Sequence, residues 1–166
     1  MKRDLANCWN RGLVLVMVAV LSPMVGRAQF SDPGAAPATS AFSIPRDHLM
    51  QPDELHKMQA GGARPLVLQV GSHVMFSQAH IRGAQYAGPG SQPAGLQLLE
   101  SKVAGLNKNT LVLLYCGCCP WNHCPNVGPA FHRLVELGFV HVKVLYLANN
   151  FGADWVSRGY GVETGD

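Results

Sequence analysis

The residues of this chain best suited to chemistry are four cysteines in one short segment: Cys116, Cys118, Cys119 and Cys124. They follow an apolar run, residues 111–115, and precede a stretch with the pattern of a helix. A buried strand that delivers a cysteine into a loop closed by a helix N-terminus lowers the pKa of that thiol, because aligned backbone N–H groups stabilise the thiolate. We therefore expect Cys116, the first cysteine after the strand, to be ionised and reachable from solvent.

Three interpretations of this cysteine cluster are open on the residues alone. The first is thiol or sulfur chemistry at a nucleophilic cysteine. The second is metal binding, because four thiolates with His123 in reserve suit Cu(I), zinc or an iron–sulfur centre. Structural zinc commonly uses Cys-x-x-Cys pairs, and the adjacent Cys118 and Cys119 are hard to aim at one ion, so copper is the better metal candidate. The third is a disulfide that staples the loop of an inactive binding module.

The N-terminus has the residue order of a secretory signal peptide over residues 1–28. It begins with basic residues, continues with the apolar run 12–21 and ends in small residues at Ala28. Ser22 and Pro23 interrupt the apolar run before it reaches the roughly 20 residues that a membrane span needs. Residues 29–45, rich in small residues and proline, are expected to form a flexible linker, and residues 46–166 are expected to form one domain. We expect a periplasmic or secreted protein that is not embedded in a membrane after cleavage.

The basic charge of the chain belongs to this predicted signal peptide. The formal net charge of +3 is accounted for by Lys2, Arg3, Arg11 and Arg27 less Asp4. The rest of the chain is close to neutral and has no Lys/Arg cluster, so we expect no nucleic-acid partner. Cys8 also lies in the signal peptide, which leaves the exported protein with the four loop cysteines. Cysteines confined to one loop favour a reactive, metal-binding or locally cross-linked cluster over scattered structural disulfides.

Helical and strand patterns alternate around the cysteine segment. Residues 52–59 have proline and acids in the first turn and end at a glycine pair, as a helix does. Residues 66–70 and 110–115 are apolar runs typical of buried parallel strands, and residues 140–146 alternate as a third strand. Residues 96–103 are amphipathic, and Asn126 can cap a helix that ends at Gly138. This order predicts an α/β fold with an open, mainly parallel sheet flanked by helices on both faces, with ligands beyond the carboxyl ends of the strands.

Several motifs follow one another in an order that resembles the rhodanese-like sulfurtransferase domain. The most specific are His80-Ile-Arg-Gly-Ala84 and the junction of the apolar run 111–115 with Cys116; segments 67–70, 137–145 and 155–162 continue the order. The resemblance spans nearly all of residues 47–163. It implies a parallel five-stranded sheet flanked by helices, and a persulfide carried on Cys116. In this pattern His80 is a turn residue, which we expect to hydrogen-bond to the backbone.

The resemblance also implies partners: a small sulfur donor, such as thiosulfate or a persulfide, and a thiol acceptor, with no cofactor. Cys118, Cys119 or Cys124 would resolve the persulfide to a disulfide, and His123 would assist proton transfer. The remaining residues of the candidate loop are Gly117, Pro120, Trp121 and Asn122.

The chain departs from the usual pattern of this domain at two places. Gln69 and Gly71 stand where an acid and an arginine are usual around the first buried strand, so no structural ion pair is expected there. The cysteine loop is unusually long, and no Lys or Arg lies between Cys116 and Arg133. The loop therefore lacks the arginine that usually closes the cradle for an anionic donor.

Overall fold

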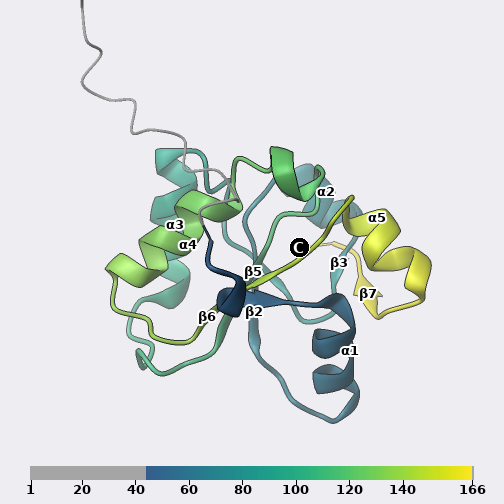
Figure 1. Ribbon diagram of the computed structural model, residues 1–166. Coiled ribbons are helices and arrows are strands. Elements are labelled where there is room, and N and C mark those ends of the chain that lie inside the picture. The colour runs from purple at the N-terminus through teal and green to yellow at the C-terminus, as the bar shows by residue number, and fades with distance from the viewer. Residues whose placement is uncertain (1–43, 166) are drawn as a thin grey trace, which may run out of the picture. The chain divides into compact units, whose positions relative to one another are not determined.

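The computed structural model describes residues 44–165 of the chain (Figure 1). The predicted signal peptide, and the predicted linker except for its last two residues, lie outside the described residues. Ile44 is buried and belongs to the hydrophobic core. No helix among the described residues is long and apolar enough to cross a lipid bilayer.

A five-stranded sheet forms the centre of the domain, and each of its strand pairs is parallel. Its order is β1-β6-β5-β2-β4. The strands are β1 (Leu49–Met50), β2 (Leu66–Gln69), β4 (Gln85–Tyr86), β5 (Val112–Tyr115) and β6 (Val142–Leu145). The expected parallel α/β architecture is thus confirmed, with β5, the strand before the cysteines, in the middle of the sheet.

Helices cover both faces of this sheet, as expected. They are α1 (Pro52–Ala60), α2 (His73–Gln78), α3 (Pro93–Val103), α4 (Val127–Glu136) and α5 (Phe151–Asp154), with short 3₁₀ turns at η2 (Arg46–His48), η3 (Trp121–His123) and η4 (Val156–Arg158). Figure 1 shows α3 and α4 on one side of the sheet, and α1 and α5 on the other.

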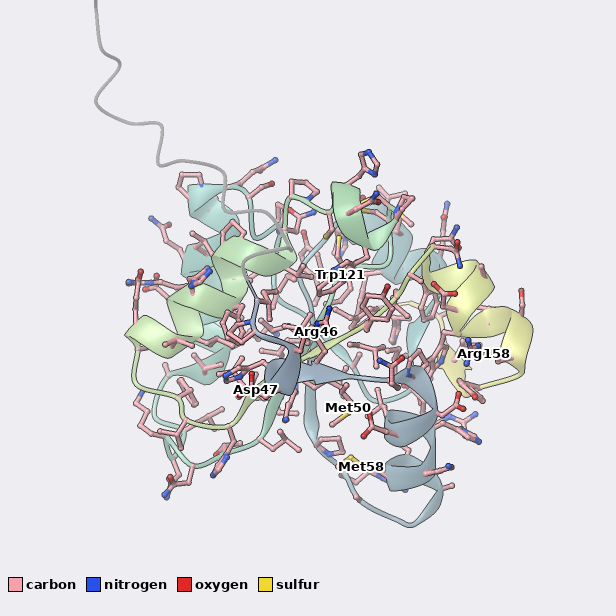
Figure 2. The ribbon with its side chains drawn as sticks, in the orientation of Figure 1. Arg46, Asp47, Met50, Met58, Trp121 and Arg158 are labelled. Carbon is pink, nitrogen blue, oxygen red and sulfur yellow. The ribbon has the colours of Figure 1, made fainter. Side chains whose placement is uncertain are left out.

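Alternate residues of the strands supply two hydrophobic cores. On β5, Leu114 packs in the core under α3 and α4, whereas Leu113 packs in the core under α1, α2 and α5. Successive side chains of a strand point to opposite faces, so a strand covered on both sides must be apolar throughout. In Figure 2, Met50 and Met58 lie between α1 and the sheet, within the second core.

The shortest elements were not expected from sequence patterns. β1 and β4 have two residues each, and α2 and α5 are short, so no period can show in them. A separate two-stranded antiparallel sheet pairs β3 (His80–Ile81) with β7 (Val162–Glu163). These pieces depend on contacts between distant parts of the chain.

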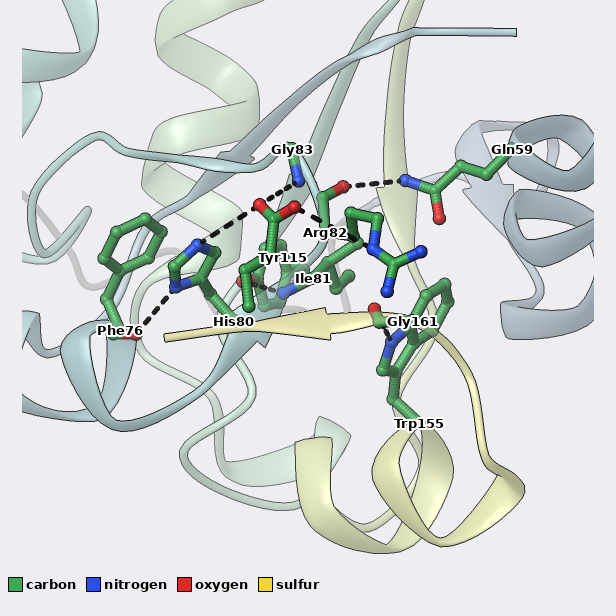
Figure 3. Close-up of polar contacts among 10 residues, drawn as sticks. Gln59, Phe76, His80, Ile81, Arg82, Gly83, Tyr115, Trp155 and Gly161 are labelled. Carbon is green, nitrogen blue, oxygen red and sulfur yellow. Dashed lines mark hydrogen bonds and ion pairs between the residues drawn. The ribbon is translucent and has the colours of Figure 1, made fainter. Parts of the chain in front are cut away.

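The His80 motif forms a junction between these two sheets, in which His80 and Ile81 are buried (Figure 3). Nδ1 of His80 hydrogen-bonds to the carbonyl oxygen of Phe76 at 2.9 Å, which confirms the expected backbone contact. The imidazole stacks on the Phe76 ring, and its Nε2 lies 3.9 Å from a carboxylate oxygen of Glu163. The N–H of Ile81 donates to the hydroxyl of Tyr115, the last residue of β5. His80 therefore fixes the position of α2 relative to the strand that carries the cysteines.

Candidate active site

The cysteine loop begins at the carboxyl edge of the sheet, between β5 and β2. The chain leaves β2 toward α2 on one face of the sheet and leaves β5 toward α4 on the other, so these two strands form the topological switch point. In open parallel sheets this is the crevice where ligands bind. Cys116 is the first residue after β5 and lies at this position.

Gln69 joins the ends of the two strands at this crevice. Its Nε2 donates to the carbonyl oxygen of Cys116 at 3.3 Å, and its Oε1 accepts the N–H of Gly71 at 3.1 Å. The buried, uncharged Gln69 side chain therefore links the ends of β2 and β5 by hydrogen bonds. No ion pair forms with Gln69, as the sequence had led us to expect. A Cβ on Gly71 would lie 3.0 Å from Sγ of Cys116, so the backbone approaches this sulfur closely.

All four loop cysteines are free thiols, and their sulfurs form one cluster. Sγ of Cys118 lies 3.1 Å from Sγ of Cys116 and 3.1 Å from Sγ of Cys119. The sulfurs of Cys116, Cys119 and Cys124 lie within 4.8 Å of one another. The fold thus brings together all four cysteines that the sequence placed in one loop.

Exposure of the four thiols differs from what we expected. Cys116 is only 4% exposed and Cys124 is also buried, whereas Cys118 is exposed and Cys119 is half-buried. The prediction that the Cys116 thiol is reachable from bulk solvent is wrong, because the strand end carries it into the core beneath the loop. Cys116 instead lines a cavity at the crevice, and Cys118 is the cysteine that faces solvent.

Ionisation of the cluster also differs from expectation. Hydrogen bonds with the thiols of Cys118 and Cys124, followed by burial, raise the pKa of Cys116. The hydrogen bond from Cys116 is the main reason that the pKa of Cys118 falls to about 6. Burial and the hydrogen bond with Cys118 raise the pKa of Cys119 to about 12. The predicted low pKa therefore belongs to Cys118, and Cys116 keeps its proton within a hydrogen bond to that sulfur.

The helix N-terminus stabilises a different cysteine from the one expected. The hydrogen bond with Cys116 is the largest cause that lowers the pKa of Cys124 to about 7, and the backbone N–H groups of Val127 and Asn126 lower it further. These N–H groups belong to the first turn of α4, where orphan donors are available. The long loop places Cys124, rather than Cys116, at this end of the helix.

Asn126 is a site residue whose role the sequence did not reveal. It occupies the N-cap position of α4, but its side chain makes no capping hydrogen bond, contrary to our expectation. Its Nδ2 donates instead to Sγ of Cys116 at 3.3 Å, and its Oδ1 accepts from both N and Oγ of Ser91. The Asn126 amide thus orients the buried sulfur of Cys116. Ser91, in the segment before α3, holds the amide in place, and the sequence alone does not show that this segment lies beside Asn126.

The other predicted loop residues support the loop or lie on its surface. Nδ1 of His123 hydrogen-bonds to Oδ1 of the adjacent, exposed Asn122, and the His123 carbonyl oxygen lies 3.6 Å from Sγ of Cys119. Trp121 is partly buried against the first core, next to the ring of Tyr146 (Figure 2). Gly117 has a positive φ of 80°, and a Cβ there would lie 2.8 Å from Cβ of Phe151.

Pro120 is exposed and is the N-cap of η3, so it shapes the turn. Nδ1 of His123 hydrogen-bonds to its neighbour Asn122 rather than to a sulfur of the cluster. The sulfurs of Cys116 and Cys118, by contrast, are in direct contact at 3.1 Å.

A cavity of about 200 Å³ opens beside Cys116. Its walls come from α2, from the ends of β2 and β5, and from the segment that includes α5. The lining side chains carry no formal charge apart from the titratable Cys116 and Tyr115, and they include Met75, Phe151, Val156, Gln69 and Gln78. This cavity is the space in which a small reactant can approach the Cys116 sulfur.

The arrangement of the sulfurs also meets the basic demands of a soft metal ion. Cys116, Cys119 and Cys124 offer three mutually close thiols, and the Cys118 thiol does not belong to this group. Soft sulfur ligands favour Cu(I) and zinc, and three sulfurs around one ion suit the low coordination numbers that copper accepts. The Cys118 sulfur, the fourth of the expected set, lies 3.1 Å from the sulfurs of Cys116 and Cys119.

The sheet order, the helices on both faces and a cysteine directly after the central strand define a parallel α/β domain with a thiol site at its carboxyl edge. The chain has the rhodanese-like fold, as its motifs had indicated. Superposition on a rhodanese-like domain from Anabaena gives a TM-score of 0.53 at 19% identity, covering 70% of this chain and 79% of that one. A protein from Bacillus halodurans gives 0.56 at 22% identity, covering 70% and 77%.

One similar structure is described as an enzyme. A thiosulfate sulfurtransferase from Pseudomonas aeruginosa superposes with a TM-score of 0.50 at 19% identity, over 71% of this chain but only 20% of that one. No protein-family model matches the chain, and no curated protein matches it. The similarity is thus one of fold.

Proposed function

We propose that this protein transfers sulfane sulfur, with Cys116 as the residue that carries the persulfide. The observation that supports it most directly is the position of Cys116: it directly follows the central strand of a rhodanese-like fold and lines a cavity at the switch point. Cys118 lies 3.1 Å away and receives the proton that Cys116 must lose. A buried nucleophile with an adjacent base is the usual arrangement for covalent catalysis.

The proposed loading step moves one sulfur atom and one proton. The Cys116 sulfur attacks the outer sulfur of a donor R–S–SH, while its proton passes to the Cys118 thiolate. A new bond forms between Sγ of Cys116 and the outer sulfur, the S–S bond of the donor breaks, and its electron pair leaves with the thiolate RS⁻. Asn126 Nδ2 and the backbone N–H of Cys118 stay directed at Sγ of Cys116 and hold it in place.

Turnover requires that a second thiol take the sulfur away. An acceptor thiolate attacks the outer sulfur of the Cys116 persulfide, and the electron pair of the broken S–S bond returns to Cys116. Alternatively, the Cys118 thiolate attacks Sγ of Cys116 itself, which forms a Cys116–Cys118 disulfide and releases HS⁻; two acceptor thiols then reduce this disulfide and become oxidised to a disulfide of their own. The exposed Cys118 thiol is placed for this second route because the two sulfurs are already in contact.

Mass spectrometry of the reduced protein after incubation with a persulfide donor tests the proposal. We expect one added sulfur per chain on the peptide that contains Cys116, and none on the same peptide of Cys116→Ser. Cys118→Ser should load more slowly, because the proton acceptor is lost, yet should hold the persulfide longer. Equal loading of Cys116→Ser and wild type would exclude Cys116 as the sulfur carrier.

A second candidate function is the binding of one soft metal ion by Cys116, Cys119 and Cys124. The mutual distances of their sulfurs favour it. Metal analysis of anaerobically purified protein should then find about one copper or zinc per chain. Cys119→Ser should lose the metal, and the neighbouring Cys118→Ser should keep it. Loss of the metal from both variants to the same degree would contradict a three-cysteine site.

We further propose that residues 1–28 direct the chain to the periplasm or the exterior. The basic start, apolar run and small-residue end support this proposal. Expression of the full chain in a bacterial host, followed by fractionation and N-terminal sequencing, should find the mature protein outside the cytoplasm with its N-terminus at Gln29. Retention of Met1 in a cytoplasmic product would contradict it.

A further inference from the structure

We infer that the sulfur donor is a small organic persulfide with an apolar, uncharged arm, rather than an anion such as thiosulfate. This inference rests on the proposed function and concerns the cavity beside Cys116. None of the described residues that line this cavity has a charged side chain. Two of them, Met75 and Val156, are apolar and still 36% and 42% exposed. The entrance therefore offers hydrophobic surface to a reactant.

Three arginines near the site along the chain already have acidic partners. Arg82, which follows the cavity-lining Ala79 closely in the chain, has its Nε 3.8 Å from a carboxylate oxygen of Glu163. Arg133, in α4, binds Glu100 with its Nε at 2.7 Å. Arg158, two residues beyond Val156, donates from Nη1 to Asp53 at 2.8 Å. Releasing a guanidinium from its carboxylate to serve the cavity would carry an additional cost in free energy.

Charge and size together therefore select the donor. Moving an anion from water into a cavity without a countercharge is unfavourable, whereas an alkyl arm gains free energy from contact with Met75, Phe151 and Val156. A volume of about 200 Å³ is below the roughly 300 Å³ at which drug-sized pockets begin, so the arm must be short. The uncharged form R–S–SH is also the form whose outer sulfur is open to attack.

This donor loads Cys116 by the same step as in the proposed sulfur transfer. Sγ of Cys116 bonds to the outer sulfur, the alkyl thiolate RS⁻ leaves with the electron pair, and Cys118 takes the proton. No oxidant or reductant is needed, because the sulfane sulfur only changes its partner. The leaving alkyl thiolate picks up a proton from water outside the cavity.

Donors matched in size but not in charge test the inference. Propyl persulfide, the persulfide of 3-mercaptopropionate and thiosulfate are each mixed with the reduced wild-type protein, and sulfur loading on Cys116 is followed by quenched-flow mass spectrometry. We expect propyl persulfide to load about tenfold faster than the carboxylated analogue, the scale of selectivity of a small apolar pocket. Met75→Lys should narrow this ratio by accelerating the two anionic donors, whereas Met75→Leu should preserve it.

Each outcome decides between the inference and the function on which it rests. Loading by thiosulfate or the carboxylated persulfide as fast as by propyl persulfide would overturn the inference and leave sulfur transfer standing. A ratio unchanged by Met75→Lys would also overturn it, since the cavity would then not be the route of the donor. A thiol assay under denaturing conditions shows whether all the cysteines are reduced. If they are, and none of the three donors loads sulfur on Cys116, the proposed function itself is overturned.

Discussion

At the scale of single residues, the four cysteines differ more from one another than their shared loop suggests. Cys116 is buried and protonated, and Cys118 is exposed with a lowered pKa, although one glycine separates them in sequence. The difference arises because a hydrogen bond between two thiols favours one shared proton: the buried sulfur keeps it, and the solvated sulfur carries the charge. In the proposed function, this pair would therefore supply a nucleophile and its proton acceptor.

The lowered pKa of Cys118 predicts how the reduced protein reacts with iodoacetamide. A thiol is unreactive below its pKa, so we expect one fast-reacting thiol per chain whose rate rises through about pH 6 and levels off near neutrality. Ordinary thiols, with a pKa of about 8.5, still accelerate above neutrality. Alkylation quenched at set times, followed by peptide mapping, measures this rate profile from about pH 4 to about pH 9, a range that spans the titration of such thiols.

Protein unfolded in urea provides the control, because all its cysteines should titrate as ordinary thiols. Cys118→Ser should remove the fast phase. A fast phase that maps to Cys116 in the folded protein would contradict the assignment of the charge to Cys118.

At the scale of elements, loops after the strands decide where the reactive groups lie. The loop between β5 and α4 is long enough to turn through η3, so Cys124 rather than Cys116 meets the first turn of α4. The loop after β6 closes the other side: the N–H of Phe151 donates to the carbonyl oxygen of Gly117. Asp154, at the end of α5, anchors this second loop.

Asp154 is 6% exposed and accepts hydrogen bonds from N and Nδ2 of Asn149 and from N of Asn150. Burial opposes its charge, but these donors prevail, and its pKa is lowered. Asp154→Asn removes acceptor capacity from a buried site, so we expect a loss of about 1–3 kcal/mol in the free energy of unfolding near neutral pH. Urea denaturation of both proteins across a range of pH measures the difference.

The sign of the pH dependence follows from the direction of the pKa shift. A depressed pKa in the folded state stabilises the fold above the unfolded-state pKa of about 3.9, and this contribution is lost as the pH falls through the folded-state pKa. The difference between wild type and Asp154→Asn should therefore be constant near neutrality and shrink in acid. Asp53→Asn, at an exposed ion pair, is the control and should change stability less. A difference that grows in acid would contradict this account.

At the scale of the whole described domain, one sheet divides two hydrophobic cores and makes them one folding unit. Leu113 and Leu114 are adjacent on β5, and both are fully buried, but they belong to different cores. The site lies at the edge where both cores end, so its geometry depends on the packing of both. The rhodanese-like fold is in this sense the support of the thiol cluster.

This architecture predicts that a cavity-forming substitution in either core lowers the stability of the whole domain. Leu113→Ala and Leu114→Ala should each lower the free energy of unfolding by about 2–5 kcal/mol, through lost burial and a cavity. Because the strands are shared, each variant should still unfold in one transition, coincident by far-UV circular dichroism and tryptophan fluorescence. Val74→Ala, at a side chain that is 65% exposed, is the control and should change stability by less than about 0.5 kcal/mol. Separate transitions for the two probes would contradict a single unit.

The architecture of the domain could be predicted from the sequence because its evidence is local. Each strand or helix shows its own pattern, as the apolar runs 66–70 and 110–115 and the amphipathic helices do. The order strand, helix, strand then allows few topologies. The cysteine cluster was equally visible, since its members are neighbours in the chain. β1, β4 and the pair of β3 with β7 were not predicted, because strands of two residues have no period and exist only through pairing with distant segments.

The states of the cysteines were decided only by the tertiary structure. Burial of Cys116, the bond from Asn126 to its sulfur and the close approach of Gly71 all come from residues that are not adjacent to Cys116 in sequence. A pKa and an accessible surface depend on everything packed around a group, so spacing along the chain cannot assign them. The sequence by itself therefore determined which residues can react and on what scaffold, and the packing of that scaffold decided which sulfur is charged, which is buried and what can reach it.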